Sequence, residues 1–155
     1  MGTKQPRAWT AALAAVIAGG LALSGCQQVT AFFVQSPPKF DQKTVDALST
    51  TQKDADALFG TLSATTGCAY SANAAQFDLV DTDLAALVKE AGSVPNNSFT
   101  LNGSNSLLRG FDKFRAAAAS NNSGCLPPGL AQDKKSSFDA AVANLTTYEN
   151  AKPKG

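Results

Sequence analysis

The stretch that decides the fold is residues 41–62, DQKTVDALSTTQKDADALFGTL. One mostly apolar face of this stretch consists of Val45, Leu48, Gln52, Ala55, Phe59 and Leu62. These residues are spaced by 3, 4, 3, 4 and 3 positions. Residues three and four apart lie on the same side of an α-helix, so this spacing predicts one amphipathic helix, and Leu58 widens its buried face. We expect the helix to begin near Asp41 and to stop at Thr66-Gly67.

The same spacing recurs three times further along the chain, over about residues 74–90, 106–119 and 130–151. The side chains expected to point inward are Phe77, Val80, Leu84 and Leu87, then Leu107, Phe111, Phe114 and Ala118, then Phe138, Ala141, Leu145 and Tyr148. Residues 93–105, SVPNNSFTLNGSN, are dense in Pro, Asn, Gly and Ser and predict the longest loop of the domain.

These four helices predict an all-α fold, an up-down four-helix bundle over residues 41–151 with a C-terminal tail at 152–155. No segment alternates apolar and polar residues long enough to predict a strand. At 155 residues the chain has room for a single modest core.

The first 25 residues have the composition of a secretory signal. Lys4 and Arg7 precede an apolar run, AWTAALAAVIAGGLAL, which ends in Leu23-Ser24-Gly25-Cys26. Those last four residues resemble the lipobox of bacterial lipoproteins, in which an aliphatic residue and two small residues precede a cysteine. The resemblance covers only this segment, and it leaves an uncleaved membrane anchor as the alternative.

The resemblance implies that residues 1–25 are removed and that Cys26 carries diacylglycerol and an N-acyl chain, with no other cofactor. It also implies an extracytoplasmic protein held on the membrane by lipid, with residues 26–40 as the lipidated N-terminus and a flexible tether. Gln27 stands where an Asp would retain a Gram-negative lipoprotein in the inner membrane. In such a cell we therefore expect the outer membrane, with the protein facing the periplasm.

The chain has three cysteines, an odd number that would leave one unpaired in an exported protein unless Cys26 carries the lipid. Cys68 and Cys125 then form a single pair in an oxidising compartment, and they lack the CxxC spacing of a redox motif. In an up-down bundle the ends of the first and third helices lie at the same end. Because each cysteine follows one of those ends, we expect a structural disulfide.

Composition excludes several functions. The chain has no histidine, which removes the commonest general base and metal ligand. Without Lys4 and Arg7 the chain has 11 basic and 12 acidic residues, and so no basic surface for nucleic acid. The segment Asp81-Thr82-Asp83 resembles the start of a calcium loop but lacks the glycine and the closing glutamate. We therefore expect no metal site.

The remaining hypotheses differ in class. We expect first a non-enzymatic accessory factor that binds another envelope protein, and Arg109, Lys113 and Arg115 are its candidate partner-binding residues. The alternative is a carrier of a small molecule or lipid, which requires a pocket that the core phenylalanines are expected to fill. The third hypothesis is a histidine-free hydrolase, whose paired catalytic carboxylates would be Asp54 and Asp56, or Asp78 and Asp81.

Overall fold

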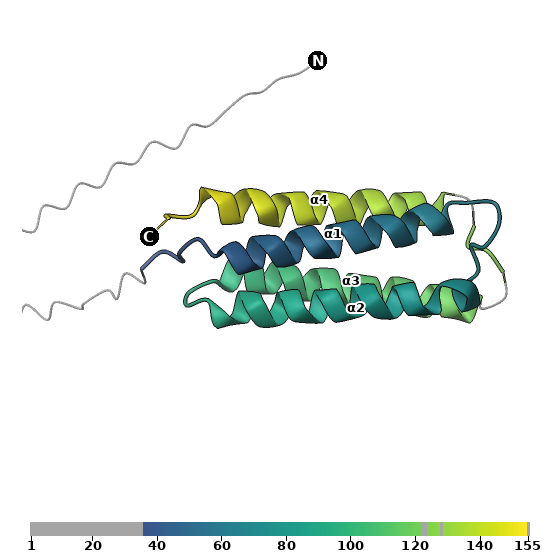
Figure 1. Cartoon of the computed structure of the whole chain (residues 1–155), viewed down its shortest axis with the longest axis horizontal. Helices are drawn as coiled ribbons and strands as arrows, with labels where there is room; N and C mark the ends of the chain where they lie inside the picture. The colour runs from purple at the N-terminus through teal and green to yellow at the C-terminus, as the bar shows by residue number, and fades with distance from the viewer. Residues whose placement is uncertain (1–35, 122–123, 128, 155) are drawn as a thin grey trace, which may run out of the picture. The chain divides into compact units, whose positions relative to one another are not determined.

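Four long antiparallel helices make up most of the described chain (Figure 1). A computed structural model describes residues 36–121, 124–127 and 129–154. The helices are α1 (Gln42–Leu62), α2 (Tyr70–Ser93), α3 (Ser98–Ser120) and α4 (Leu130–Ala151). Within those ranges there is no β-strand, only an isolated bridge between Ala69 and Cys125. The all-α prediction is confirmed.

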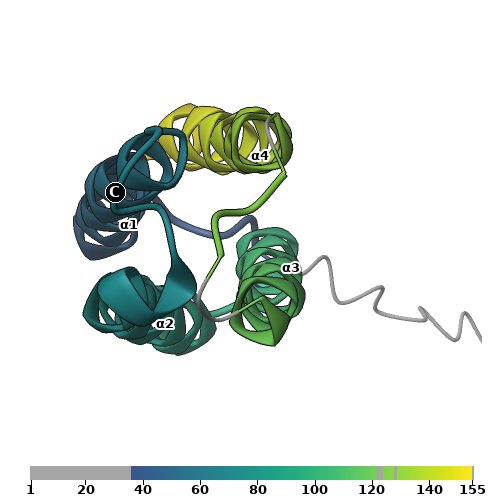
Figure 2. The same cartoon turned by 90° about the vertical axis from the view of Figure 1, so that its right-hand side faces the viewer.

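The helices stand at the corners of a square, in the order α1, α2, α3, α4 around the bundle axis (Figure 2). Residues 36–41, the connection between α2 and α3, and the C-terminal residues lie at one end, which we call the base (Figure 1). The other two connections lie at the opposite end, which we call the tip. This is the predicted up-down topology.

The disulfide joins the two connections at the tip. Cys68 and Cys125 are bonded, with their Cα atoms 5.0 Å apart, and the neighbouring Ala69 pairs with Cys125 in the isolated bridge. Cys68 is buried, whereas Cys125 is exposed. The pairing expected from the cysteine count and the helix topology is therefore confirmed.

The predicted loop over residues 93–105 is wrong for most of its length, because α3 begins at Ser98. The polar side chains in this stretch do not break the helix. Asn105 Nδ2 donates to the carbonyl oxygen of Leu101 at 2.9 Å, and Ser106 Oγ donates to that of Asn102 at 2.9 Å. These bonds run back one turn along an intact helix. The true connection is only residues 94–97.

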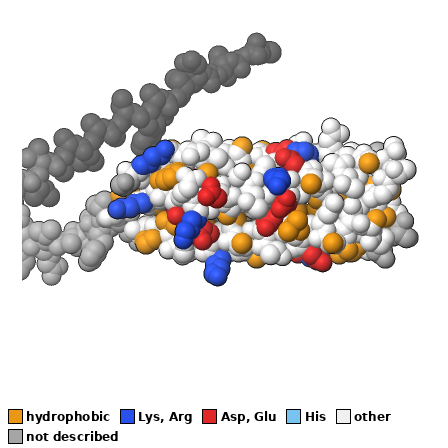
Figure 3. All heavy atoms as spheres, in the orientation of Figure 1, with side chains coloured by type: hydrophobic (Ala, Val, Ile, Leu, Met, Phe, Trp, Pro, Cys, Tyr) orange, Lys and Arg blue, Asp and Glu red, His pale blue; other side chains and the backbone are white. Residues whose placement is uncertain are grey.

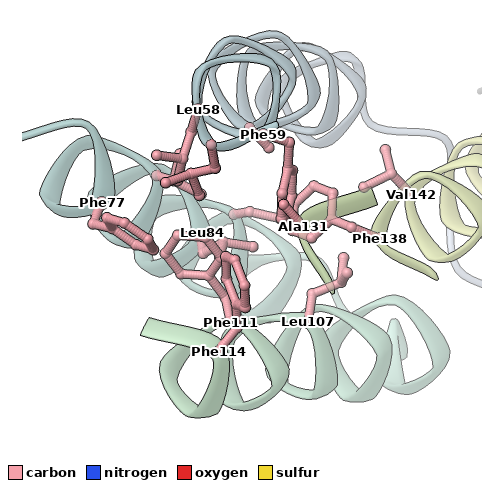
Figure 4. Close-up of a cluster of buried hydrophobic side chains, with 14 of the residues drawn as sticks. Leu58, Phe59, Phe77, Leu84, Leu107, Phe111, Phe114, Ala131, Phe138 and Val142 are labelled. Atoms are coloured by element: carbon pink, nitrogen blue, oxygen red, sulfur yellow. The ribbon is translucent and has the colours of Figure 1, made fainter. Parts of the chain in front are cut away.

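The two halves of the core differ in character. Near the tip, Phe59, Phe77, Phe111 and Phe114 pack with ring centroids 5.3–6.3 Å apart, in the range for favourable aromatic contacts (Figure 4). Near the base, the buried side chains include several polar ones: Thr44, Asn97, Thr100, Ser104, Glu149 and Lys152. Sequence periodicity predicts the aromatic half and misses the polar half.

Four of the expected inward residues lie further out than predicted. Val45, Gln52, Ala141 and Tyr148 are only partly buried. On α1 the neighbouring threonines take the inner positions, and Asp41 fixes this rotation by accepting hydrogen bonds from the backbone amide and hydroxyl of Thr44, at 2.8 and 2.7 Å. Because these inner positions are polar, a search for regularly spaced apolar residues selects the adjacent, partly buried side of the helix instead.

Residues 36–40, the end of the expected tether, pack on the base. The amide of Phe40 donates to the carbonyl oxygen of Pro153 at 3.1 Å, and Asn96 Nδ2 donates to that of Ser36 at 3.1 Å. The Lys154 ammonium lies 5.1 Å from the centre of the Phe40 ring. Cys26, the signal and the rest of the tether lie outside the described residues. None of the described helices combines the length and the apolarity needed to cross a membrane.

Candidate functional site

An apolar trough runs between α3 and α4, the neighbouring helices that pack least closely. Its volume is about 410 Å³, within the range of sites for small ligands. The trough extends from Phe99 to Phe114 along α3, and fifteen residues of helix at 1.5 Å each make it about 22 Å long.

The floor of the trough is formed by core side chains. These are Phe59, Leu107, Phe111, Phe114, Phe138 and Leu145, which come from α1, α3 and α4. Leu107 and Phe138 project from their helices toward the space between α3 and α4 (Figure 4). All six are more than nine-tenths buried, so the trough is open on one side while its floor belongs to the packed core.

The walls of the trough are made of small residues. On α3 these are Gly103, Ser106 and Gly110, and on α4 they are Ser137 and Ala141. A methyl group added to Gly103 would come within 2.5 Å of Leu145 Cδ2, so the two helices touch at that level. At Gly110 a methyl group would meet no atom within 4 Å. The trough is therefore tight near the base and open toward the tip.

The two ends of the trough differ. Toward the base, Phe99 lines the trough and stacks on Tyr148, with ring centroids 4.3 Å apart. Toward the tip, the lining includes Lys134 of α4. Lys113 follows Gly110 by three positions, so it lies beside the same part of the trough on α3. None of the described residues that line the trough is acidic.

The core phenylalanines fill the bundle core as expected, and the trough is an open groove beside that filled core. All five named for that role are buried: Phe59, Phe77, Phe111, Phe114 and Phe138. They fill the bundle axis, yet four of them also form the floor of the trough. The carrier hypothesis is therefore not excluded by a filled core. Because the glycines on α3 carry no side chain, a spacing rule that counts only apolar residues does not reveal the gap.

The candidate partner-binding residues fall into two places. Arg109 donates to Ser106 Oγ, a trough residue, at 3.1 Å, and Lys113 flanks the trough. Arg115 points instead toward α2, where it pairs with Asp78 and Asp81. The structure thus separates Arg115 from the other two.

The Arg115 cluster is a seam between α2 and α3. A hydrogen bond to the Tyr70 hydroxyl at 3.4 Å and the two aspartates together raise the pKa of Arg115, so its charge is fixed. Burial, followed by the charge of Asp81, raises the pKa of Asp112 nearby. Both partners of the second candidate carboxylate pair, Asp78 and Asp81, are thus occupied by one arginine.

Asp56, one member of the first candidate carboxylate pair, is engaged in the same way. Lys135 of α4 bridges Asp56 and Asp139, at 2.6 Å from the latter, and Gln52 Nε2 donates to Asp139 at 2.7 Å. Burial alone raises the pKa of Asp139, but these bonds and the Lys135 charge lower it overall. Asp56, the candidate carboxylate of this group, is therefore held in an ion pair with Lys135.

Asp54 lies opposite Asp83 of α2. Burial is the main cause that raises the pKa of Asp83, and the neighbouring Asp54 carboxylate adds to it. Asp81-Thr82-Asp83, the calcium-like segment, lies in the middle of α2. Within the described ranges, no three potential metal ligands come close together.

A buried ionic network at the base was not predicted from the sequence. Glu149 is fully buried and accepts hydrogen bonds from Thr100 Oγ1 and Lys152 Nζ. Lys152 Nζ also donates to Asn97 Oδ1 at 2.6 Å, and Asn97 Nδ2 donates to the carbonyl oxygen of Ala91 at 3.2 Å. The network ties the C-terminal end of α4 to the start of α3. Charged residues rarely occupy inner positions, so periodicity places Glu149 outside.

No protein-family model, curated protein or solved structure matches this chain.

Proposed function

We propose that this chain is a lipid-anchored, non-enzymatic binding protein of the bacterial envelope, and that the α3–α4 trough binds a long apolar molecule with a single chain. The observation that carries the proposal is the trough itself. It offers about 410 Å³ over a floor of buried phenylalanine and leucine side chains. Sites for small ligands have this apolar lining with few polar groups.

The surface around the trough favours a narrow ligand over a protein. A stable protein interface buries about 800 Å² on each partner and is centred on exposed anchor side chains. Among the described residues, the large apolar side chains that are exposed are Leu79 and Phe99, and only Phe99 lies at the trough. The apolar surface available to a ligand is therefore mostly inside the trough.

The anchor is proposed from the Leu23-Ser24-Gly25-Cys26 sequence. Lipid on Cys26 would hold the chain at a membrane, the source of single-chain lipids. Residues 36–40 pack on the base, so the anchored bundle would present its base toward the bilayer. Cys26→Ser is expected to leave unprocessed precursor without lipid; normal maturation of that variant would remove the anchor from the proposal.

The trough is tested by filling it. Gly110→Leu adds a side chain that meets no atom within 4 Å at its Cβ and then projects into the trough. Gly60→Leu is the matched control, because Gly60 is also helical and unobstructed but lies on α1 away from the trough. Both changes should stabilise their helix by up to about 1 kcal/mol, because leucine has the higher helix propensity.

Binding of a fluorescent single-chain probe, such as a twelve-carbon alkyl dansylamide, then separates the two variants. We expect Gly110→Leu to lose at least tenfold in affinity, because about four carbon atoms of trough space disappear at about 0.8 kcal/mol per buried methylene. Gly60→Leu should bind like the unmodified chain. Equal affinity of the two variants would show that the probe does not occupy the trough.

A second candidate function, docking of an envelope protein, is favoured by the tip. Residues 57–77 and 116–132 contain no Asp, Glu, Lys or Arg, and the tip end in Figure 3 shows no charged side chain. Interface cores are depleted in charge. If the tip docks a protein, Ala72→Lys at the tip should abolish crosslinking to it in envelopes. The control Ala86→Lys, on the charged part of α2, should not.

A further inference from the structure

We infer that the ligand of the trough is a long-chain carboxylate, with its alkyl chain on the aromatic floor and its carboxylate at Lys134. This inference rests on the proposed function and adds the chemical class of the ligand. It comes from the size of the trough and from the charge at its two ends.

The size of the trough suits one alkyl chain. Its length of about 22 Å exceeds the roughly 15 Å that acyl chains span in one leaflet, half of the hydrocarbon core, so a single chain fits along it. A volume of about 410 Å³ spread over that length makes the trough narrow, as a single alkyl chain requires. The tight contact between Gly103 and Leu145 narrows the base end, where only the thin end of a chain fits.

The charged residues at the trough determine which head group the ligand carries and at which end of the trough that head group lies. Among the described residues, Lys134 is the only charged one in the lining, and the register of α3 places Lys113 beside the trough on the facing helix. The base end is closed by the stacked rings of Phe99 and Tyr148, which offer an apolar surface to the methyl end of the chain. An anionic head at the tip end therefore meets a cation, whereas the opposite orientation would place it against aromatic rings.

Lys134 can pair with a ligand because the ion pairs between α4 and α1 are made by its neighbour Lys135, on another side of α4. Lys135 is held by Asp56 and Asp139 across the α1–α4 seam. No side-chain hydrogen bond or ion pair involves Lys134 in the part of the chain that the structure describes. An exposed ion pair contributes up to about 1 kcal/mol, which predicts a threefold to fivefold effect on affinity.

The test compares palmitate with hexadecanol, which has the same chain and no charge. The described residues from 36 to 154 form one compact unit, and its apolar core lies between Leu48 and Leu145. The chain from residue 26 onward, with Cys26→Ser, can therefore be used without its lipid. Equilibrium dialysis with ligand supplied from cyclodextrin gives the dissociation constants.

We expect Lys134→Gln to weaken palmitate binding about threefold to fivefold and to leave hexadecanol binding unchanged. Lys89→Gln is the charge-matched control, because Lys89 is exposed on α2, a helix that contributes nothing to the trough. It should change neither constant. Salt at 0.5 M should reduce the Lys134 effect, since exposed ion pairs are screened.

The outcomes separate the two proposals. If both ligands bind and Lys134→Gln affects neither, or affects both alike, the carboxylate assignment is overturned and the trough proposal stands. If Lys89→Gln weakens palmitate as much as Lys134→Gln does, the effect is one of net charge and the assignment is also overturned. If neither ligand binds, the proposed function fails together with the inference.

Discussion

Replacing Lys152 by methionine tests the buried network at the base. Lys152 and Glu149 have side chains that are only 3% and 0% exposed, so the change leaves a carboxylate inside the protein without its cation. Removing one member of a buried ion pair typically costs 3–5 kcal/mol. Thr100 still donates to Glu149, which reduces the loss, whereas Asn97 Oδ1 loses its donor, which increases it. We expect a net loss of about 3–4 kcal/mol.

The measurement is urea unfolding followed by circular dichroism at 222 nm. Lys154→Met serves as the control, because Lys154 is an exposed lysine two positions further along the chain, and it should cost less than about 1 kcal/mol. The double variant Glu149→Leu/Lys152→Met removes both charges and should recover most of the loss. A Lys152→Met loss no larger than the control loss would refute the burial argument, as would a double variant less stable than the single one.

Three further predictions concern stability. Gly110→Ala should raise the free energy of unfolding by about 0.5–1 kcal/mol through helix propensity, while Gly103→Ala should lower it by about 1 kcal/mol, because the methyl group displaces Leu145; equal effects in denaturant titrations would contradict the trough geometry. Asp83→Asn should stabilise the protein at neutral pH. Folding raises the pKa of Asp83 through burial and Asp54, so the ionised Asp83 carboxylate lowers the stability of the folded protein as pH rises above the ordinary value of 3.8. The gain in melting temperature should shrink toward pH 3.5, and a gain independent of pH would argue against it. Reduction of the disulfide, which closes a loop with a sequence separation of 57, should cost about 4 kcal/mol in the chain-entropy model; unfolding with and without reductant measures this, and an unchanged midpoint would contradict it.

The sequence predicts the parts of the fold that depend on apolar spacing. The expected bounds of α4 match the structure at both ends, and the aromatic half of the core follows from the phenylalanine positions. The disulfide follows from topology and cysteine count together. In each case a local pattern suffices, because a helix of this length with one apolar face has few ways to pack.

The failures share a physical cause, which is that polar residues can be internal when they are paired. The start of α3 reads as a loop because its Asn and Ser residues are turn formers in isolation. In the bundle, Thr100 instead bonds to Glu149, and the helix continues. Thr100 and Glu149 are 49 residues apart in the sequence, so a local pattern around either residue does not reveal that the two are bonded.

The trough could not be predicted for a related reason. It arises where Gly103 and Gly110 of α3 face Ser137 and Ala141 of α4, and small residues signal close packing as readily as a gap. Only the contact at Leu145 and the open space at Gly110 show which applies at each level. The outward direction of Arg109 and Lys113, away from the α2 seam that holds Arg115, likewise depends on the rotation of α3.

The most direct test of the central claim is to locate the bound chain on the anchored protein itself. The full lipidated chain in vesicles is exposed to a palmitate analogue with a diazirine near its methyl end, irradiated, and mapped by peptide mass spectrometry. We expect the label at the base end of the trough, on peptides that contain Phe99 and Tyr148. Labelling at the tip around the disulfide, or labelling unchanged by Gly110→Leu, would contradict the trough as the binding site.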